Sequence, residues 1–362
     1  MPDCIIIGGG VIGLLTARSL HQAGLDVLVI ERGNLGGESS WAGGGIISPL
    51  YPWRYADSVN RLAQRSKQLY PALAAALQQD SGVDSELITS GMLYTDVDEY
   101  ESARAWTQAW QVPMELIEDR QRLAEIEPAL HPDIERAMWM PDIKQIRNPK
   151  LVKALRGSLQ HAGISFIEQT EVSEILLNNG KACGVLTPQQ KILAERVIVA
   201  SGAWSARVLG AHGSLDVEPV KGQMIMYRGE PGRVRTIVLS HGHYIIPRQD
   251  GHVLAGSTLE RTGFEKQTSA GAQQALSADA SGLIPLLGDV PIERHWAGLR
   301  PGTQNGIPYI CAHDEIEGLY IHAGHYRNGI VLGPASVQLM TEIVLGQATF
   351  CDASAYTMAA LH

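Results

Sequence analysis

The sequence predicts an α/β fold in which a Rossmann-like domain is interleaved with a second, α+β domain built on a mainly antiparallel sheet. Three observations predict it. The chain has 362 residues, which is more than one hydrophobic core usually supports. Residues 3–31 have the pattern of a β-α-β unit, and residues 215–260 alternate strand and turn signals.

The composition excludes several classes of protein. Hydrophobic residues make up 45% and charged residues 19%, as in ordinary globular proteins. The net charge of −9 and the lack of a basic run argue against a nucleic-acid partner. The apolar N-terminus is broken by three glycines and is too short to cross a bilayer, so we expect no signal peptide and no membrane partner. The four cysteines lack a CxxC pair, which predicts free thiols and a cytoplasmic location.

The first elements form the β-α-β unit. Residues 3–8 and 26–31 are apolar runs rich in β-branched side chains, and a glycine turn between them opens a helix that ends near Gly24. The next segment is rich in glycine, and we expect its start to be irregular. A long helix follows over 54–80, where apolar residues recur at helical spacing.

The middle of the chain mixes strands and helices. Asn148-Pro149 supplies an N-cap and a proline at the first helical position, and Asn179-Gly180 suits a hairpin turn. In chain order we expect a strand at 91–96, helices at 98–110 and 119–126, an irregular stretch to 141, a helix at 148–163, a strand at 164–168, a hairpin of 171–178 and 181–187, and a strand within 193–200.

The last third completes the second domain and then returns to the first. After the strands of 215–260 we expect a helix at 268–283, strands at 292–299, 307–311 and 318–322, and a final helix to about Gly346. This order assigns residues 1–80, 142–216 and 304–362 to the Rossmann-like domain. It assigns residues 81–141 and 217–303 to the second domain.

A dinucleotide-binding fingerprint occupies the first turn. Gly8, Gly10 and Gly13 satisfy the GxGxxG pattern between a predicted strand and helix, and Glu31 ends the next strand. The three glycines serve a tight turn, close approach of a pyrophosphate and close helix packing, while an acidic residue accepts hydrogen bonds from a ribose. Glu31 disfavours NADP, and both NAD and FAD remain open on these residues alone.

A second glycine cluster, SSWAGGGII at 39–47, favours a flavin. Ser39 and Ser40 offer hydroxyls for phosphate or ribityl oxygens, and the run from Ala42 to Gly45 has no side chain that would block a flat ring. The alternative for this segment alone is a flexible loop.

Arg300 lies among small and apolar residues in HWAGLRPG, and no acidic residue occurs between Glu293 and Asp314. A buried charge needs a partner. The sequence leaves two candidates open: a distant acid such as Glu260 or Glu218, or a ligand.

Taken in order, the motifs IIIGGGVIGLLTA, VIERG, GGESSWAGGGII, VIVASGAWS, HWAGLRPGT and AGHYRNGIVLGPA resemble the D-amino-acid oxidase group of flavoproteins over nearly the whole chain. Within it they look most like the glycine oxidases linked to thiamine biosynthesis. Besides Gly8, Gly10 and Gly13, the resemblance assigns the FAD site to Val11, Ile12, Glu31, Arg32, Ser39, Ser40, Gly44, Gly45, Ile46, Val172, Gly202, His325, Tyr326, Arg327, Asn328, Gly329, Ile330 and Val331.

The resemblance also implies substrate contacts. Arg300 would hold the substrate carboxylate through two parallel hydrogen bonds, and the Tyr244 hydroxyl would contact the same carboxylate. Arg327 would lie nearby. The alternatives are that Tyr244 is a structural, half-buried tyrosine and that Arg327 bonds to flavin or backbone.

The implied reaction oxidises a small amino acid with O₂ to a keto acid, ammonia and hydrogen peroxide, without an assigned general base. Glycine is the expected substrate, with sarcosine and small D-amino acids as alternatives. Other candidates are a sarcosine oxidase, a D-amino-acid dehydrogenase that reduces a quinone, and a non-catalytic FAD-bound subunit.

Several smaller expectations complete the sequence analysis. WAGLRPG has no cysteine to attach a flavin, so FAD should be noncovalent. The pairs His241/His243 and His322/His325 lack a third ligand, so we expect no metal. The aromatic segment 48–58 forms either a lid or surface packing. The resemblance implies a homotetramer.

Overall fold

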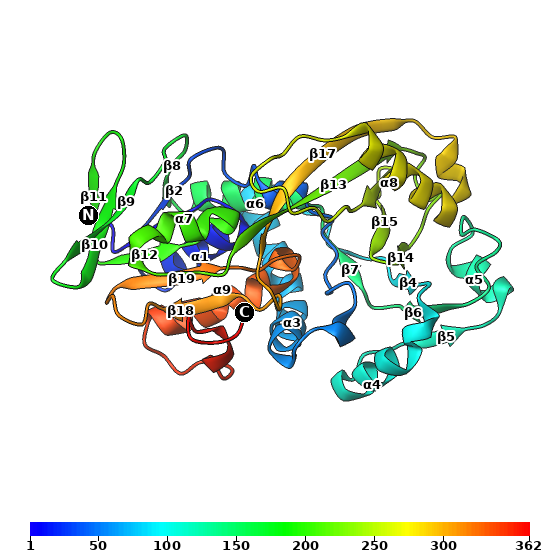
Figure 1. Ribbon diagram of the computed structural model, residues 1–362, viewed down its shortest axis with the longest axis horizontal. Coiled ribbons are helices and arrows are strands. Elements are labelled where there is room, and N and C mark those ends of the chain that lie inside the picture. The colour runs from blue at the N-terminus through cyan, green and yellow to red at the C-terminus, as the bar shows by residue number, and fades with distance from the viewer.

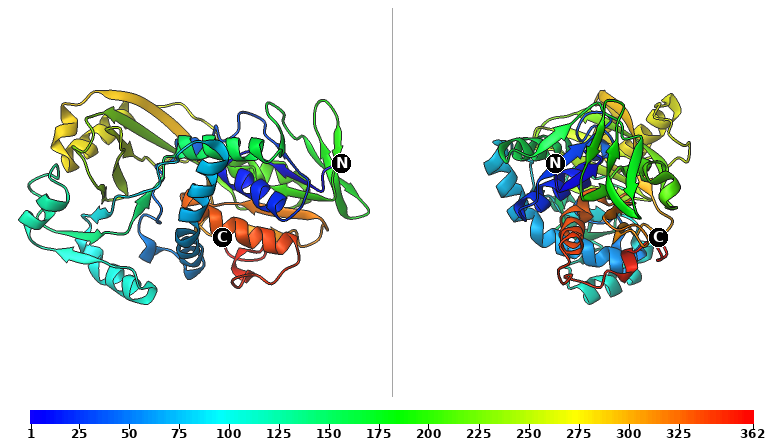
Figure 2. Two further views of the ribbon diagram at one scale, coloured as in Figure 1. Left: turned by 180° about the vertical axis from the view of Figure 1, so that it is seen from behind. Right: turned by 90° about the vertical axis from the view of Figure 1, so that its left-hand side faces the viewer.

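The computed structural model describes all residues, 1–362, and has two lobes, each built on a sheet (Figures 1 and 2). The first sheet has six strands in the order β18-β19-β12-β1-β2-β8. All neighbours pair in parallel except β18, which is antiparallel to β19. Its strands are β1 (Cys4–Ile7), β2 (Val27–Ile30), β8 (Ser165–Ile167), β12 (Arg196–Val199), β18 (Tyr309–Ala312) and β19 (Leu319–Ala323).

Both faces of this sheet are covered, which explains the unbroken apolar run of β1. Cys4 and Ile6 point into one core, and Ile5 and Ile7 point into another. The first core is filled by α1 (Val11–Gln22), α3 (Asp57–Ser81), α6 (Asn148–His161) and α9 (Gly329–Val344). The second is covered by α7 (Ser205–Leu209) and by a meander of β9 (Glu174–Asn178), β10 (Lys181–Leu186) and β11 (Lys191–Leu193).

The second sheet has eight strands in the order β17-β13-β16-β15-β14-β4-β6-β5 and is antiparallel except where β4 meets β14. It forms the right-hand lobe of Figure 1, with α8 (Ala270–Leu283), α5 (Arg120–Ile126) and α4 (Tyr100–Trp110) packed on it. Its strands are β4 (Met92–Tyr94), β5 (Glu115–Ile117), β6 (Ala137–Met140), β13 (Glu218–Arg228), β14 (Ile237–Ser240), β15 (His243–Pro247), β16 (His252–Gly256) and β17 (Ile292–Gly302).

Strand membership supports the proposed division of the chain. The six-stranded sheet takes strands only from the three segments assigned to the Rossmann-like domain, and the eight-stranded sheet only from the other two. Two short elements, β3 (Ile88–Thr89) and β7 (Lys144–Gln145), pair with each other where the chain passes between the lobes. No helix is long and apolar enough to cross a membrane.

Two local predictions were wrong. The stretch expected to be irregular before residue 141 contains β6, and the strand β5 was not expected between α4 and α5. Asn148 does not cap α6: the helix already includes it, and its side chain donates instead to the Ser40 carbonyl over 3.0 Å.

The aromatic segment 48–58 packs against the second lobe. Tyr51 is buried, and its hydroxyl donates to Asp96 over 2.7 Å and accepts from the Gly242 amide. The Trp53 indole N–H donates to Glu99 over 2.6 Å. These bonds favour the packing interpretation over a mobile lid.

Candidate active site

The first glycine turn joins β1 to α1 at the carboxyl end of the six-stranded sheet. Gly8 has φ +116°, and a Cβ there would overlap the Ala200 carbonyl. A Cβ on Gly13 would overlap the Gly8 oxygen, so α1 approaches the turn this closely only because residue 13 has no side chain. The N-terminus of α1, with its free N–H groups, is therefore available to an anion.

Two polar side chains shape this turn. The Glu31 carboxylate, 9% exposed, accepts from the Gly9 amide over 2.7 Å and from the Gly33 amide over 2.8 Å. The Ser40 hydroxyl accepts from the Val11 amide over 2.8 Å, so its own proton is free for another acceptor. A carboxylate has about four acceptor positions, so Glu31 retains capacity for ribose hydroxyls.

A cavity of about 470 Å³ runs from this turn to the second lobe and is lined by residues of both sheets. Every residue predicted above to contact FAD or substrate lies on its wall except Gly13, whose contact is with Gly8. No cysteine lines the cavity. The structure thus brings together residues that are spread along the chain from Ile7 to Val331.

The cavity wall fits FAD. A Cβ on Gly44 would lie 2.7 Å from Ile246 Cδ1 and 3.2 Å from the Tyr244 ring, and Gly45 has φ +76°. This loop therefore presents backbone alone, as a flat ring system requires. The N-terminus of α9 also lines the wall, next to the buried Asn328 amide, whose nitrogen has no partner within the chain.

Arg300 has no acidic partner. Its Nη2 donates to Ser257 Oγ over 2.7 Å and its Nη1 donates to the Thr258 carbonyl over 3.3 Å. Glu260 is held instead by Lys221 at 2.9 Å, and Glu218 pairs with Arg261. The distant-acid alternatives are therefore excluded, and the guanidinium faces the cavity.

The buried position of Arg300 beside a second arginine favours the binding of an anion. Burial lowers the pKa of Arg300, while Tyr244 raises it and the nearby charge of Arg327 lowers it further. The Tyr244 hydroxyl, in a side chain that is 7% exposed, has only the weak acceptor Met224 Sδ at 3.6 Å. Two cations and an under-used hydroxyl thus share one end of the cavity.

Comparison with known proteins identifies the family. Residues 3–343 match the family described as FAD dependent oxidoreductase (DAO). The chain belongs to the DAO family. It is 44% identical over 98% of both chains to a protein named glycine oxidase from Pseudomonas aeruginosa, and 33% identical to one from Geobacillus kaustophilus over 98% of this chain and 96% of that one.

Solved structures agree with this membership. The fold matches the crystal structure of the G. kaustophilus glycine oxidase with a TM-score of 0.94 and 31% identity, over 99% of this chain and 98% of that one. It matches an iminodiacetate oxidase from Chelativorans with a TM-score of 0.87 and 25% identity, over 99% of this chain and all of that one. The protein is an FAD-dependent oxidoreductase.

Sequence reasoning missed residues of this DAO-family site that come from β13. Gly222 and Met224 line the cavity, and Gly222 pairs directly with Gly298 of β17. A Cβ on Gly222 would overlap the Arg300 guanidinium, so the guanidinium can pack directly against the backbone of residue 222 only because this residue is a glycine. The signal in the sequence was a lone glycine in a strand, which marks a close approach without naming the neighbour.

A buried histidine chain supports the wall beside α9. Thr16 donates its hydroxyl proton to the Ile12 carbonyl, so it accepts from His322 Nδ1 over 3.0 Å. His322 Nε2 is then unprotonated and accepts from Ser336 Oγ over 2.6 Å, which in turn accepts from His325 Nε2 over 2.7 Å. This order fixes the tautomer of both rings, and His325 lies on the DAO-family cavity.

These histidines predict acid lability. Burial lowers the pKa of His325 to about 3, and burial together with His325 lowers that of His322 well below its ordinary value. Unfolded imidazoles take up protons near pH 6.5, so as pH falls from there toward 3 the unfolded state binds more protons and stability is lost, by up to about 1.4 kcal/mol per pH unit for each histidine.

We therefore expect His325→Asn to flatten the fall of Tm between pH 6.5 and 4.5, measured by circular dichroism on the FAD-loaded protein. His161→Gln, a change at the exposed end of α6, is the control and should keep the wild-type slope. An unchanged slope in His325→Asn would show that the imidazole already titrates freely in the folded state.

Proposed function

We propose that this protein is a glycine oxidase. The observation that carries the proposal is the pair of arginines, Arg300 and Arg327, that line the cavity without a carboxylate partner from the chain. Two neighbouring cations of this kind suit the carboxylate of an acid bound beside FAD. The relatives named glycine oxidase, at up to 44% identity over 98% of the chain, support glycine as that acid.

The cofactor is held by the residues of the two glycine turns, by Glu31 and Ser40, and by the N-terminus of α9. When bound, FAD accepts the hydride from the substrate Cα and passes the electrons to O₂, which becomes hydrogen peroxide. Because no cysteine lines the cavity, we propose that FAD is noncovalent.

Arg300 binds the substrate carboxylate. Its two hydrogen bonds to Ser257 and Thr258 fix the orientation of the guanidinium plane. The remaining N–H groups of the guanidinium can then donate to both oxygens of a carboxylate without rearrangement. The Tyr244 hydroxyl donates to the same carboxylate once it turns from Met224. Fixing the acid end in this way orients Cα, which replaces much of the entropy cost of a bimolecular step.

Arg300 and Arg327 place two positive charges at the substrate end of the cavity. Their charge favours the neutral amine of glycine over its ammonium form, and no side chain is assigned as a general base. Water then hydrolyses the released imine, so glycine, O₂ and water give glyoxylate, ammonia and hydrogen peroxide. Met224 and Tyr244 line the cavity with Arg300, and we propose that they limit the space around the substrate Cα. We also propose that sarcosine and small D-amino acids are secondary substrates.

An anaerobic titration with glycine tests the proposal. We expect the yellow protein to bleach and then to recover in air with release of peroxide. A yellow protein that glycine leaves unchanged would retain the fold and overturn the substrate. Bleaching by sarcosine or D-alanine alone would favour a sarcosine oxidase or D-amino-acid enzyme, and bleaching that only a quinone analogue reverses would favour a dehydrogenase. If no amino acid bleaches the flavin, the remaining interpretation is that the protein is a non-catalytic FAD-bound subunit.

Three further proposals remain. Several relatives are bifunctional ThiO/ThiG proteins, of which this chain covers about half (52% in one case), so we propose that the imine product supplies thiazole formation in thiamine biosynthesis. We propose a cytoplasmic location, because all four cysteines are free thiols. We also propose a homotetramer, which light scattering after size exclusion would test.

A further inference from the structure

Arg248 is a buried cation without a carboxylate ligand. The residue follows β15 directly and is 6% exposed. Its Nη1 donates to Gln145 Oε1 over 2.6 Å and to the Ile146 carbonyl over 3.2 Å, and its Nη2 donates to the Gly44 carbonyl over 2.7 Å. All three acceptors are neutral. Burying a cation in this way costs free energy, so a purely structural role is poorly served by an arginine.

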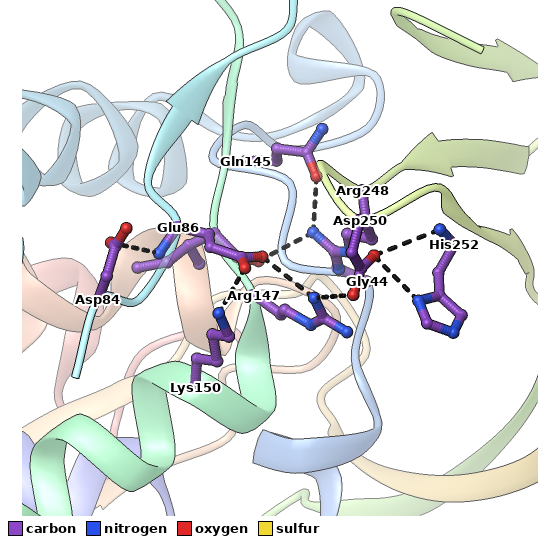
Figure 3. A network of polar contacts seen from close by, with 10 residues as sticks. Gly44, Asp84, Glu86, Gln145, Arg147, Lys150, Arg248, Asp250 and His252 are labelled. Atoms are coloured by element: carbon purple, nitrogen blue, oxygen red, sulfur yellow. Dashed lines mark hydrogen bonds and ion pairs between the residues drawn. The ribbon is translucent and has the colours of Figure 1, made fainter. Parts of the chain in front are cut away.

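The nearby acids are engaged by other cations (Figure 3). Arg147 lies 2.6 Å from Asp250 and 3.3 Å from Glu86, and Lys150 lies 2.5 Å from Glu86. Burial and the like charge of Arg147 lower the pKa of Arg248 to about 10, so it stays charged at neutral pH. The guanidinium of Arg248 is therefore left to its three neutral acceptors, of which Gly44 lines the cavity.

Gly44 connects Arg248 to the cavity. The Gly44 carbonyl points toward Arg248, which is not on the cavity wall, whereas Gly45 is. In a trans peptide the N–H of the next residue points opposite to the carbonyl, so the Gly45 N–H is turned toward the cavity. The N–H groups of Gly44, Gly45 and Ile46 donate to no acceptor within the chain.

The same contact sets the spacing of the two lobes at the site. Gly44 packs against the ring of Tyr244 and the side chain of Ile246. Both residues belong to β15, and Arg248 directly follows that strand. Gln145 and Ile146 belong to the connection between the lobes. One guanidinium thus joins the cofactor loop, the connection and the strand that carries the substrate-binding tyrosine.

We propose that Arg248 is a positioning residue that grips the Gly44 carbonyl and thereby aims the N–H groups of the 44–46 loop at the bound flavin. The orientation of the guanidinium matters more than its charge here: Nη1 holds Gln145 and Ile146 while Nη2 holds Gly44, so the two segments are fixed relative to each other. The proposal rests on the FAD site but not on glycine as the substrate, so it is tested by cofactor binding even if glycine is not turned over.

The experiment compares FAD affinity and the visible circular dichroism of bound FAD in three variants. Arg248→Met removes the grip and should raise the Kd of FAD at least tenfold and alter the flavin spectrum. Arg248→Lys keeps the charge without the fork and should also raise the Kd about tenfold. Gln145→Glu places a carboxylate next to the positive charge of Arg248 and keeps the hydrogen bond from Arg248 to the Gly44 carbonyl. This variant should have a Kd for FAD within threefold of wild type.

Leu276→Ala, a core truncation in α8, controls for lost stability and should lower Tm without changing the spectrum. Wild-type FAD affinity and spectrum in Arg248→Met would overturn the proposal. A Gln145→Glu variant that is impaired while Arg248→Lys is normal would also overturn it, because charge and not grip would then be the cause. If Arg248→Met does not fold, the contrast between the other two variants decides.

Discussion

Replacing Arg300 with methionine should lower kcat/KM for glycine by roughly 10²–10⁴-fold while FAD stays bound. Two charge-assisted hydrogen bonds to the carboxylate are lost, each contributing about 1.5–3 kcal/mol. Arg300→Lys should recover part of the loss, since it restores a point charge but not the planar fork. Initial rates of oxygen consumption, normalised to flavin absorbance, measure the effect.

Arg294→Met supplies the matched control, because Arg294 lies on the same strand, β17, but is exposed to solvent. It should behave as wild type. A KM for glycine within threefold of wild type in Arg300→Met would mean that the carboxylate binds elsewhere, and Arg327 would then be the next residue to replace.

Gly222→Ala should impair glycine oxidation almost as strongly without touching the substrate. The added methyl would overlap both terminal nitrogens of Arg300, so the guanidinium must move. A displacement of about 1 Å in a positioning group can cost roughly 100-fold in rate. We expect kcat/KM to fall by about that factor, mostly through KM, with normal FAD content.

The control for this prediction is Gly271→Ala in α8, where a Cβ meets nothing and helix propensity improves. The double variant Gly222→Ala/Arg300→Met sharpens it: the alanine should add little once the guanidinium is gone, because both changes act through one interaction. Additive losses would show that Gly222 has a separate role.

The sequence predicted what depends on local pattern. The β-α-β unit, the two glycine turns and the helix expected at 148–163 follow from signals within about 20 residues, and the structure contains all three, the helix as α6. Arg300 and Tyr244, which the family resemblance singled out as substrate contacts, line one cavity, and their roles stay predictions. The strands β5 and β6 were missed because runs such as Ala137–Met140 lack the β-branched residues that mark a strand.

What could not be predicted depends on register. Gly222 lies under Arg300 only because β13 and β17 pair so that Gly222 faces Gly298, and Ser257 reaches the same guanidinium from β16's end. Arg248 was not singled out either, since its three acceptors come from segments about 100 and 200 residues away. Such contacts follow from the assembled sheets and not from any local pattern.

Because the two lobes are interleaved along the chain, the six-stranded sheet can form completely only after nearly the whole chain has left the ribosome. The first strand made, β1, is central and apolar on both faces, yet its neighbour β12 begins at residue 196 and the sheet is finished only by β19 and α9. At translation rates of about 5–20 residues per second, the nascent strand waits roughly 15–60 s for the C-terminal segment. Cofactor loading is therefore a late event, and the incomplete chain is a natural client for chaperones.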